Sequence, residues 1–271
     1  MSLVFEKCLK NLFASYLLKN RARDARLQFF IFSLRLQKQL AAGPVSLNEL
    51  CTIRGEYSLD YYARGWSLIY YLLYAENGKY RSRLHAYYAN AKRPQDPIVD
   101  FKRFFGSEPE GFARTWRDYF AKLEPRSAEE MMTAALAAAE HRFDPELGMR
   151  YADAAVNKTP SDWRTKLCRA RVLLRSAQLA GSRERYLEST SAFAEAYALR
   201  PVHIASRQKR SLRDSSIDLE YGVACANAGG YDCAVEIADR ILEEDDLNGG
   251  AYRLLALVAA IADDPNYRDL A

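Results

Sequence analysis

The segment from Leu219 to Ile241 constrains the fold of this chain more than any other stretch of its sequence. Two helix-forming runs flank Gly229-Gly230, and paired glycines end a helix and let the chain reverse. Small residues, Gly222 and Ala234, stand where the two helix backbones would approach closely, and Tyr231 fills the corner after the turn. The segment therefore predicts a tight helical hairpin in which these three residues have a structural role.

The spacing of this hairpin resembles the tetratricopeptide repeat (TPR), a helix–turn–helix unit of about 34 residues. The same register is expected to recur at about 127–160, 161–201, 215–248 and, in part, 249–271. TPR units stack into an α-solenoid, so the resemblance implies a solenoid over residues 125–271. We expect an all-α fold, in which an aromatic-rich helical subdomain at 1–124 precedes the TPR-like α-solenoid.

Aromatic residues at helical spacing define the expected core of residues 1–124. A helix expected at about 59–75 carries Tyr62 and Trp66, and a later helix carries Trp116 and Tyr119. Apolar residues occupy nearly all sides of the first of these helices, which is typical of a buried helix. The four aromatic residues are therefore expected to have a structural role.

Residues of about 41–123 also resemble the C-terminal helical part of peptidase-MA-like (gluzincin) zinc metalloproteases. The resemblance rests on the run YARGWSLIYYLL from Tyr62 to Leu73, on Phe105-Gly106, and on the run WRDY from Trp116 to Tyr119. Members of that family often carry TPR repeats after the protease domain, which is the order expected here. The resemblance implies a protease-derived helical scaffold.

The zinc-binding helix of that family, with its His-Glu-x-x-His motif, is missing from this sequence. The family's third zinc ligand is a glutamate, and Glu6 lies near its place, but Lys7 stands where a glycine is expected. A catalytic zinc needs about three protein ligands, which one carboxylate cannot supply. We therefore expect no catalytic residue, no metal site and no cofactor in a truncated or degenerate relative. The alternative is a fragment of a zinc-dependent peptidase that is active only with the missing upstream segment.

Other enzyme signatures are absent as well. The sequence contains neither the Gly-x-Ser-x-Gly motif of serine hydrolases nor the phosphate-binding loop motif. Its five cysteines lack any Cys-x-x-Cys spacing, which excludes a zinc ribbon and offers no disulfide framework. The sequence therefore favours binding over catalysis.

Charge and hydropathy limit the classes of partner. Residues 1–40 hold eight basic and two acidic side chains, and the rest of the chain is close to neutral. Such a basic arm could bind nucleic acid or anionic lipid, but no RNA-binding signature accompanies it, so a solvated helix face is the simpler interpretation. We find no signal peptide and no run near the roughly 20 apolar residues of a membrane-spanning helix. As written, the chain is expected to be cytoplasmic, although a longer form could be exported.

The expected function is a non-catalytic protein–protein interaction scaffold. In TPR units the first helix of each pair lines the concave face, where a peptide or protein partner binds. For the third expected repeat, this assigns partner binding to Ser216, Leu219, Val223, Ala226 and Asn227. The set contains no lysine or arginine, so we expect apolar or backbone-mediated contacts with the ligand.

The last helix is expected to present an apolar face formed by Tyr252, Leu255, Val258 and Ala259. Little sequence follows to cover this face, and solenoid ends need a polar cap. Exposed apolar faces are association sites. We therefore expect self-association through the C-terminal helix, or a longer native chain.

Overall fold

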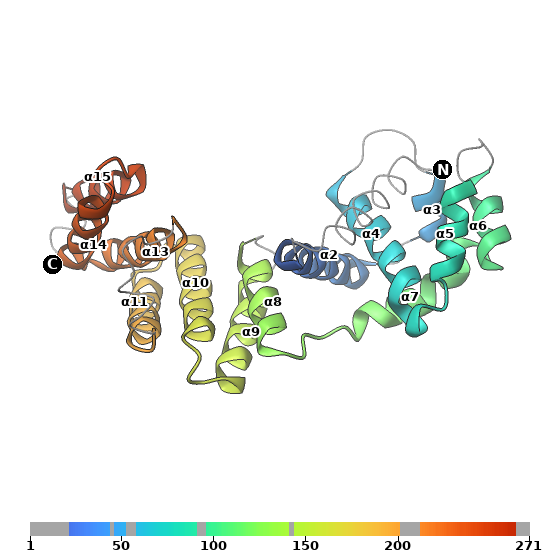
Figure 1. The fold of residues 1–271 in the computed structure, drawn as a ribbon, viewed down its shortest axis with the longest axis horizontal. Coiled ribbons are helices and arrows are strands. Elements are labelled where there is room, and N and C mark those ends of the chain that lie inside the picture. Colours follow the sequence, from blue (N-terminus) through green and yellow to red (C-terminus); the bar gives the residue numbers. More distant parts are fainter. Residues whose placement is uncertain are drawn as a thin grey trace. The chain divides into compact units, whose positions relative to one another are not determined.

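The computed structural model describes residues 22–43, 46–52, 58–90, 96–140, 144–200 and 212–263. Over these ranges every regular element is a helix and no strand occurs, which confirms the expected all-α class (Figure 1). The chain divides into two compact units, Met1–Pro125 and Arg126–Ala271. None of the described helices combines the length and the apolar character that spanning a membrane requires. Glu6, Lys7 and residues 264–271 lie outside the described ranges.

The first unit is built from helices whose ends follow local capping signals. Its elements are α2 (Ala22–Ala42), α3 (Leu47–Thr52), α4 (Leu59–Tyr74), η2 (Ala75–Gly78), α5 (Arg81–Asn90), α6 (Pro97–Phe105), η3 (Pro109–Phe112) and α7 (Ala113–Ala121). The Ser58 hydroxyl accepts a hydrogen bond from Tyr61 N at 3.3 Å and caps α4. The Asp96 carboxylate caps α6, and Gly106 ends α6 in the left-handed conformation with φ of 80°.

The core of the first unit surrounds α4, which packs against α2, α5 and α7. Trp66 in α4 is only 5% exposed, and its ring centroid lies 5.3 Å from that of Phe32 in α2. Trp116 is fully buried, and Tyr62 and Tyr119 pack against the same cluster from partly buried positions. All four aromatic residues singled out in the sequence belong to this core.

A carboxylate from a distant part of the sequence holds the N-terminus of α3. Glu110 Oε2 accepts hydrogen bonds from Leu47 N at 2.9 Å and from the Ser46 hydroxyl at 3.1 Å. In return, Asn48 Oδ1 accepts a hydrogen bond from Glu110 N at 3.1 Å. These reciprocal bonds fix α3 against η3, and they satisfy backbone N–H groups that a helix N-terminus leaves without an intrahelical partner.

The second unit is a series of helices in which each described helix packs against the next one (Figure 1). Its helices are α8 (Ala128–Glu140), α9 (Pro145–Lys158), α10 (Trp163–Ala180), α11 (Arg183–Ala198), α13 (Leu212–Ala228), α14 (Tyr231–Glu244) and α15 (Gly249–Asp263). Contacts also join α8 to α10 and α13 to α15. Contacts between first and second neighbours are the pattern of helical hairpins stacked one after another.

Glycines close the hairpin of α13 and α14. Gly229 adopts φ of 91°, in the left-handed region that favours glycine, and Gly230 N donates a hydrogen bond to Cys225 O at 2.8 Å. Ala234 is fully buried, and Tyr231 packs against the same cluster from a partly buried position. The turn and its small residues therefore bring α13 and α14 together.

Gly222 has a different partner from the expected one. A Cβ atom at this position would lie 2.3 Å from Leu254 Cδ2 in α15 and 3.4 Å from Ile237 Cγ2 in α14. Its closest neighbour is thus a side chain of α15, and the glycine leaves room for that side chain. The expectation that Gly222 mainly brings the backbones of α13 and α14 together is corrected accordingly.

The apolar face of α15 that the sequence predicts to be uncovered is exposed only in part. The buried residues of α15 are Ala251, Leu254 and Val258. Tyr252 is 54% exposed, and its hydroxyl donates a hydrogen bond to Asp246 O at 3.0 Å. Ala259 is exposed and Leu255 is only partly buried. The expectation of an uncovered face is therefore wrong for Val258, which is buried in a cluster with α13 and α14, whereas Tyr252 and Ala259 are exposed.

A buried ion pair fixes α13 against the residues that end the preceding hairpin. Asp218 in α13 is 1% exposed and accepts a hydrogen bond from the Tyr197 hydroxyl. Arg200 Nη1 lies 4.0 Å from Asp218 Oδ1, and the guanidinium lies 5.7 Å from the ring centroid of Trp163. Burial raises the pKa of Tyr197, and Asp218 raises it further. This polar cluster connects α10, α11 and α13, which together with α15 position the site described next.

Candidate functional site

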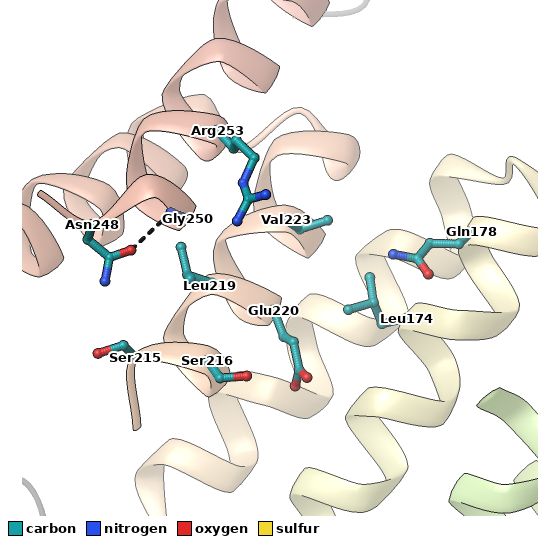
Figure 2. A pocket seen from close by; sticks show the side chains of 10 residues that line it. All are labelled: Leu174, Gln178, Ser215, Ser216, Leu219, Glu220, Val223, Asn248, Gly250 and Arg253. Atoms are coloured by element: carbon teal, nitrogen blue, oxygen red, sulfur yellow. Dashed lines mark hydrogen bonds between the residues drawn. The ribbon is translucent and has the colours of Figure 1, made fainter. Parts of the chain in front are cut away.

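A pocket opens on the second unit between α10, α13 and α15, with a cavity volume of about 410 Å³ (Figure 2). Its lining residues are Leu174 and Gln178 in α10, Ser215, Ser216, Leu219, Glu220 and Val223 in α13, Asn248 before α15, and Gly250 and Arg253 in α15. The pocket thus exists only where helices from successive parts of the series stack.

Three of the five residues expected to bind a partner line this pocket. Ser216, Leu219 and Val223 lie on one side of α13 and face the cavity together. Ala226 is fully buried in a cluster with α14 and α15, so it cannot contact a partner. Asn227 is not part of the lining, and its Nδ2 donates a hydrogen bond to Val223 O at 2.8 Å. The assignment of Ala226 is corrected, because α13 turns this residue into the core, whereas the assignment of Asn227 stays a prediction outside this pocket.

Aliphatic side chains from two helices form the apolar part of the pocket. Leu174 of α10 is 6% exposed, whereas Leu219 and Val223 of α13 are partly buried. Figure 2 shows Leu174 and Leu219 on opposite sides of the cavity. A Cβ atom at Gly250 would lie 2.4 Å from Leu219 Cδ1, so the glycine lets α15 approach this leucine closely.

Most polar acceptors of the lining already have donors. Glu220 Oε2 accepts a hydrogen bond from Arg171 Nε at 2.5 Å, and Gln178 Oε1 accepts one from Arg175 Nη1 at 2.9 Å. Burial raises the pKa of Glu220, while Arg171 acts in the opposite direction. We treat Glu220 as an ionised partner of Arg171, because the guanidinium is in direct contact with the carboxylate. The lining therefore offers a ligand little uncompensated negative charge.

Arg253 is the cationic side chain of the lining. It is exposed, and Figure 2 shows its guanidinium pointing from α15 toward Leu219 and Val223. In the part of the chain that the structure describes, no hydrogen bond or ion pair joins Arg253 to another side chain. The helical spacing within α13 could not predict Arg253, because this residue lies in α15. Glu220, which follows Leu219 on α13, could have been found from helical spacing.

The hydroxyl groups of the lining come from Ser215 and Ser216. Ser215 and Ser216 have no histidine beside them in the pocket lining. Within the described ranges, no group of three or more histidine, cysteine, aspartate or glutamate residues is placed to hold a metal ion. Burial raises the pKa of the Cys168 thiol to about 12, so this cysteine stays protonated at neutral pH. What the pocket offers chemically is apolar surface next to a free guanidinium.

Comparisons of the chain with models of protein families, with curated proteins and with solved structures found no match. The TPR and metalloprotease resemblances therefore rest on the residues that carry them. The geometry of the pocket is the observation from which a function can be inferred.

Proposed function

We propose that this chain is a non-catalytic protein–protein interaction scaffold whose residues 126–271 form a TPR-like α-solenoid. In this proposal the pocket between α10, α13 and α15 binds an extended peptide segment of a partner protein. The order of helix contacts supports the solenoid, since repeat proteins stack each unit on its neighbours. The first unit would be a metalloprotease-like helical domain, an interpretation that rests on the run from Tyr62 to Leu73 in α4.

The observation that carries the proposal is the apolar surface that Leu174, Leu219 and Val223 form together. Ligand pockets typically have volumes of roughly 300–1,000 Å³ and combine apolar lining with a few polar groups. The cavity of about 410 Å³ lies within this range. At about 1.5 Å per residue, α13 from Ser216 to Val223 is about 10 Å long, which equals about three residues of extended peptide. The pocket therefore suits two or three side chains of such a segment.

A blocking substitution on the rim tests this proposal without disturbing the core. Ser216 is exposed and lines the pocket, so Ser216→Trp fills the cavity with a bulky side chain. Ser191 in α11 is also exposed but lies outside the lining, so Ser191→Trp is the matched control. The probe is a phage-displayed library of random 12-residue peptides, panned against the full chain.

We expect peptides selected on the unmodified chain to bind Ser191→Trp equally well and Ser216→Trp at least about tenfold more weakly, a loss of about 1.4 kcal/mol. Fluorescence anisotropy with synthetic copies of the selected peptides measures this difference. Circular dichroism checks that both variants keep their helical content. A library that yields no specific binder, or binders that Ser216→Trp leaves unaffected, would contradict the proposal.

A further inference from the structure

Two acceptors of the pocket lining are already engaged, whereas its cationic donor is not paired within the described residues. The acceptors Glu220 Oε2 and Gln178 Oε1 already receive hydrogen bonds from Arg171 and Arg175. By contrast, the guanidinium of Arg253 has five N–H donors and no acceptor. A ligand group that pairs with Arg253 must therefore supply acceptors.

The N-terminus of α15 does not supply these donors, because it is already capped. Asn248 Oδ1 accepts a hydrogen bond from Gly250 N at 3.1 Å (Figure 2). It accepts a second one from Ala251 N at 3.2 Å. The backbone N–H groups nearest to the pocket are thus occupied. The group left to meet an anionic acceptor is the Arg253 side chain, three residues further along the same helix.

The local charge at the pocket differs from the charge of the surrounding segment. Residues 214–263 contain eleven acidic side chains, and Arg240 and Arg253 are their only basic ones. The acidic residues of α14, among them Glu236 and Asp239, are exposed but do not line the pocket. Exposed charges are screened over about 8 Å at physiological ionic strength. The charged groups that matter most inside the cavity are therefore Arg253 and Glu220 of the lining, and Glu220 is paired with Arg171.

We infer that the pocket selects a peptide segment in which an aliphatic side chain adjoins an aspartate or glutamate, and that Arg253 binds the carboxylate of that acidic residue. The aliphatic side chain contacts Leu174, Leu219 and Val223, and the adjoining carboxylate accepts hydrogen bonds from the guanidinium. This inference rests on the proposed peptide-binding function and adds the chemistry of the partner. In this inference the carboxylate belongs to a side chain and not to a chain end, and probes that lack a terminal carboxylate test this.

The probes are three pools of hexapeptides with acetylated N-termini and amidated C-termini, which carry no terminal charge, each labelled with an uncharged dye through an added C-terminal cysteine amide. The first pool places leucine, isoleucine or valine before aspartate or glutamate in a background of alanine, glycine and serine. The second replaces the acidic residue with lysine, and the third replaces the aliphatic residue with glycine. Anisotropy titrations use the full chain, Arg253→Glu, and the control Arg150→Glu, an exposed arginine of α9 outside the lining.

We expect the acidic pool to bind the unmodified chain roughly threefold to tenfold more tightly than the lysine pool, as suits a partly exposed ion pair. The glycine pool should bind weakly. Arg253→Glu should reverse the preference between acidic and lysine pools, and Arg150→Glu should leave it unchanged. A preference that survives Arg253→Glu, or equal binding of the acidic and lysine pools, overturns the inference.

The two proposals fail in distinguishable ways. If Ser216→Trp weakens the binding of panned peptides but acidic and lysine peptides bind equally well, the proposed peptide site is supported and the proposed role of Arg253 is contradicted. If no peptide from either source binds the full chain, both proposals fall.

Discussion

At the scale of single residues, Gly222 shows how α13 accommodates a neighbouring helix. We expect Gly222→Ala to destabilise the second unit by about 1–3 kcal/mol, because overpacking a filled core costs about that much. The added Cβ would meet Leu254 Cδ2 at 2.3 Å, and Leu254 is only 2% exposed, so its side chain has little room to move. The gain in helix propensity from glycine to alanine, about 1 kcal/mol, offsets only part of this cost.

Urea unfolding, monitored by circular dichroism, measures this change in the free energy of unfolding. Gly249→Ala is the matched control, since no atom lies within 4 Å of a Cβ built at Gly249. The control should unfold at the same urea concentration as the parent or slightly above it. If Gly222→Ala also unfolds no earlier than the parent, Leu254 does not pack against α13 as described.

The same residues show what sequence alone can indicate at this scale. The small size of Gly222 and Ala226 marks both as sites of close approach, but it does not say which helix approaches. The partner of Gly222 is Leu254, which lies in α15, beyond the whole of α14 in the sequence. Ala226 suits an exposed groove and a core equally well, and only the position of α14 decides that it is buried.

At the scale of helices, α4 carries the core of the first unit. We expect Trp66→Ala to cost about 3–5 kcal/mol, because it removes a large side chain that is only 5% exposed. It also removes the ring contacts with Phe32 at 5.3 Å and with Tyr70 at 5.2 Å between centroids. Urea unfolding and near-ultraviolet circular dichroism report on this change. Val99→Ala in α6, a residue 61% exposed, should cost no more than about 0.5 kcal/mol. A Trp66→Ala variant that melts within a few degrees of the parent would show that the α4 packing is described wrongly.

Helix ends are largely predictable from sequence, whereas helix rotations and long-range caps are not. Local backbone preferences mark these boundaries: Gly106 and Gly229 end helices, and a proline begins each of α6 and α9. The rotation of α15 depends on where Leu254 finds space, which its own sequence does not specify. The carboxylate cap on α3 comes from Glu110, 63 residues away from Leu47, so no local pattern reveals it.

At the scale of the whole molecule, the two units differ in charge and have separate buried clusters. Residues 1–125 carry 20 basic and 12 acidic side chains, and residues 126–271 carry 19 and 23. Aromatic side chains dominate the cluster of the first unit, and alanine is frequent in those of the second. This contrast in composition is visible in the sequence. The pocket is not, because Leu174 and Arg253 meet only through the stacking of α10, α13 and α15.

The central claim is that this pocket is where the chain binds a peptide, and hydrogen exchange measured by mass spectrometry tests it most directly. The full chain is compared with and without a saturating peptide selected from the library, and Ser216→Trp is the control. We predict slower exchange in residues 212–228 and 249–263 and in the second half of α10, no change in residues 128–158, and no protection in Ser216→Trp. Protection confined to α8 and α9 or to the first unit, or protection that persists in Ser216→Trp, would contradict the claim.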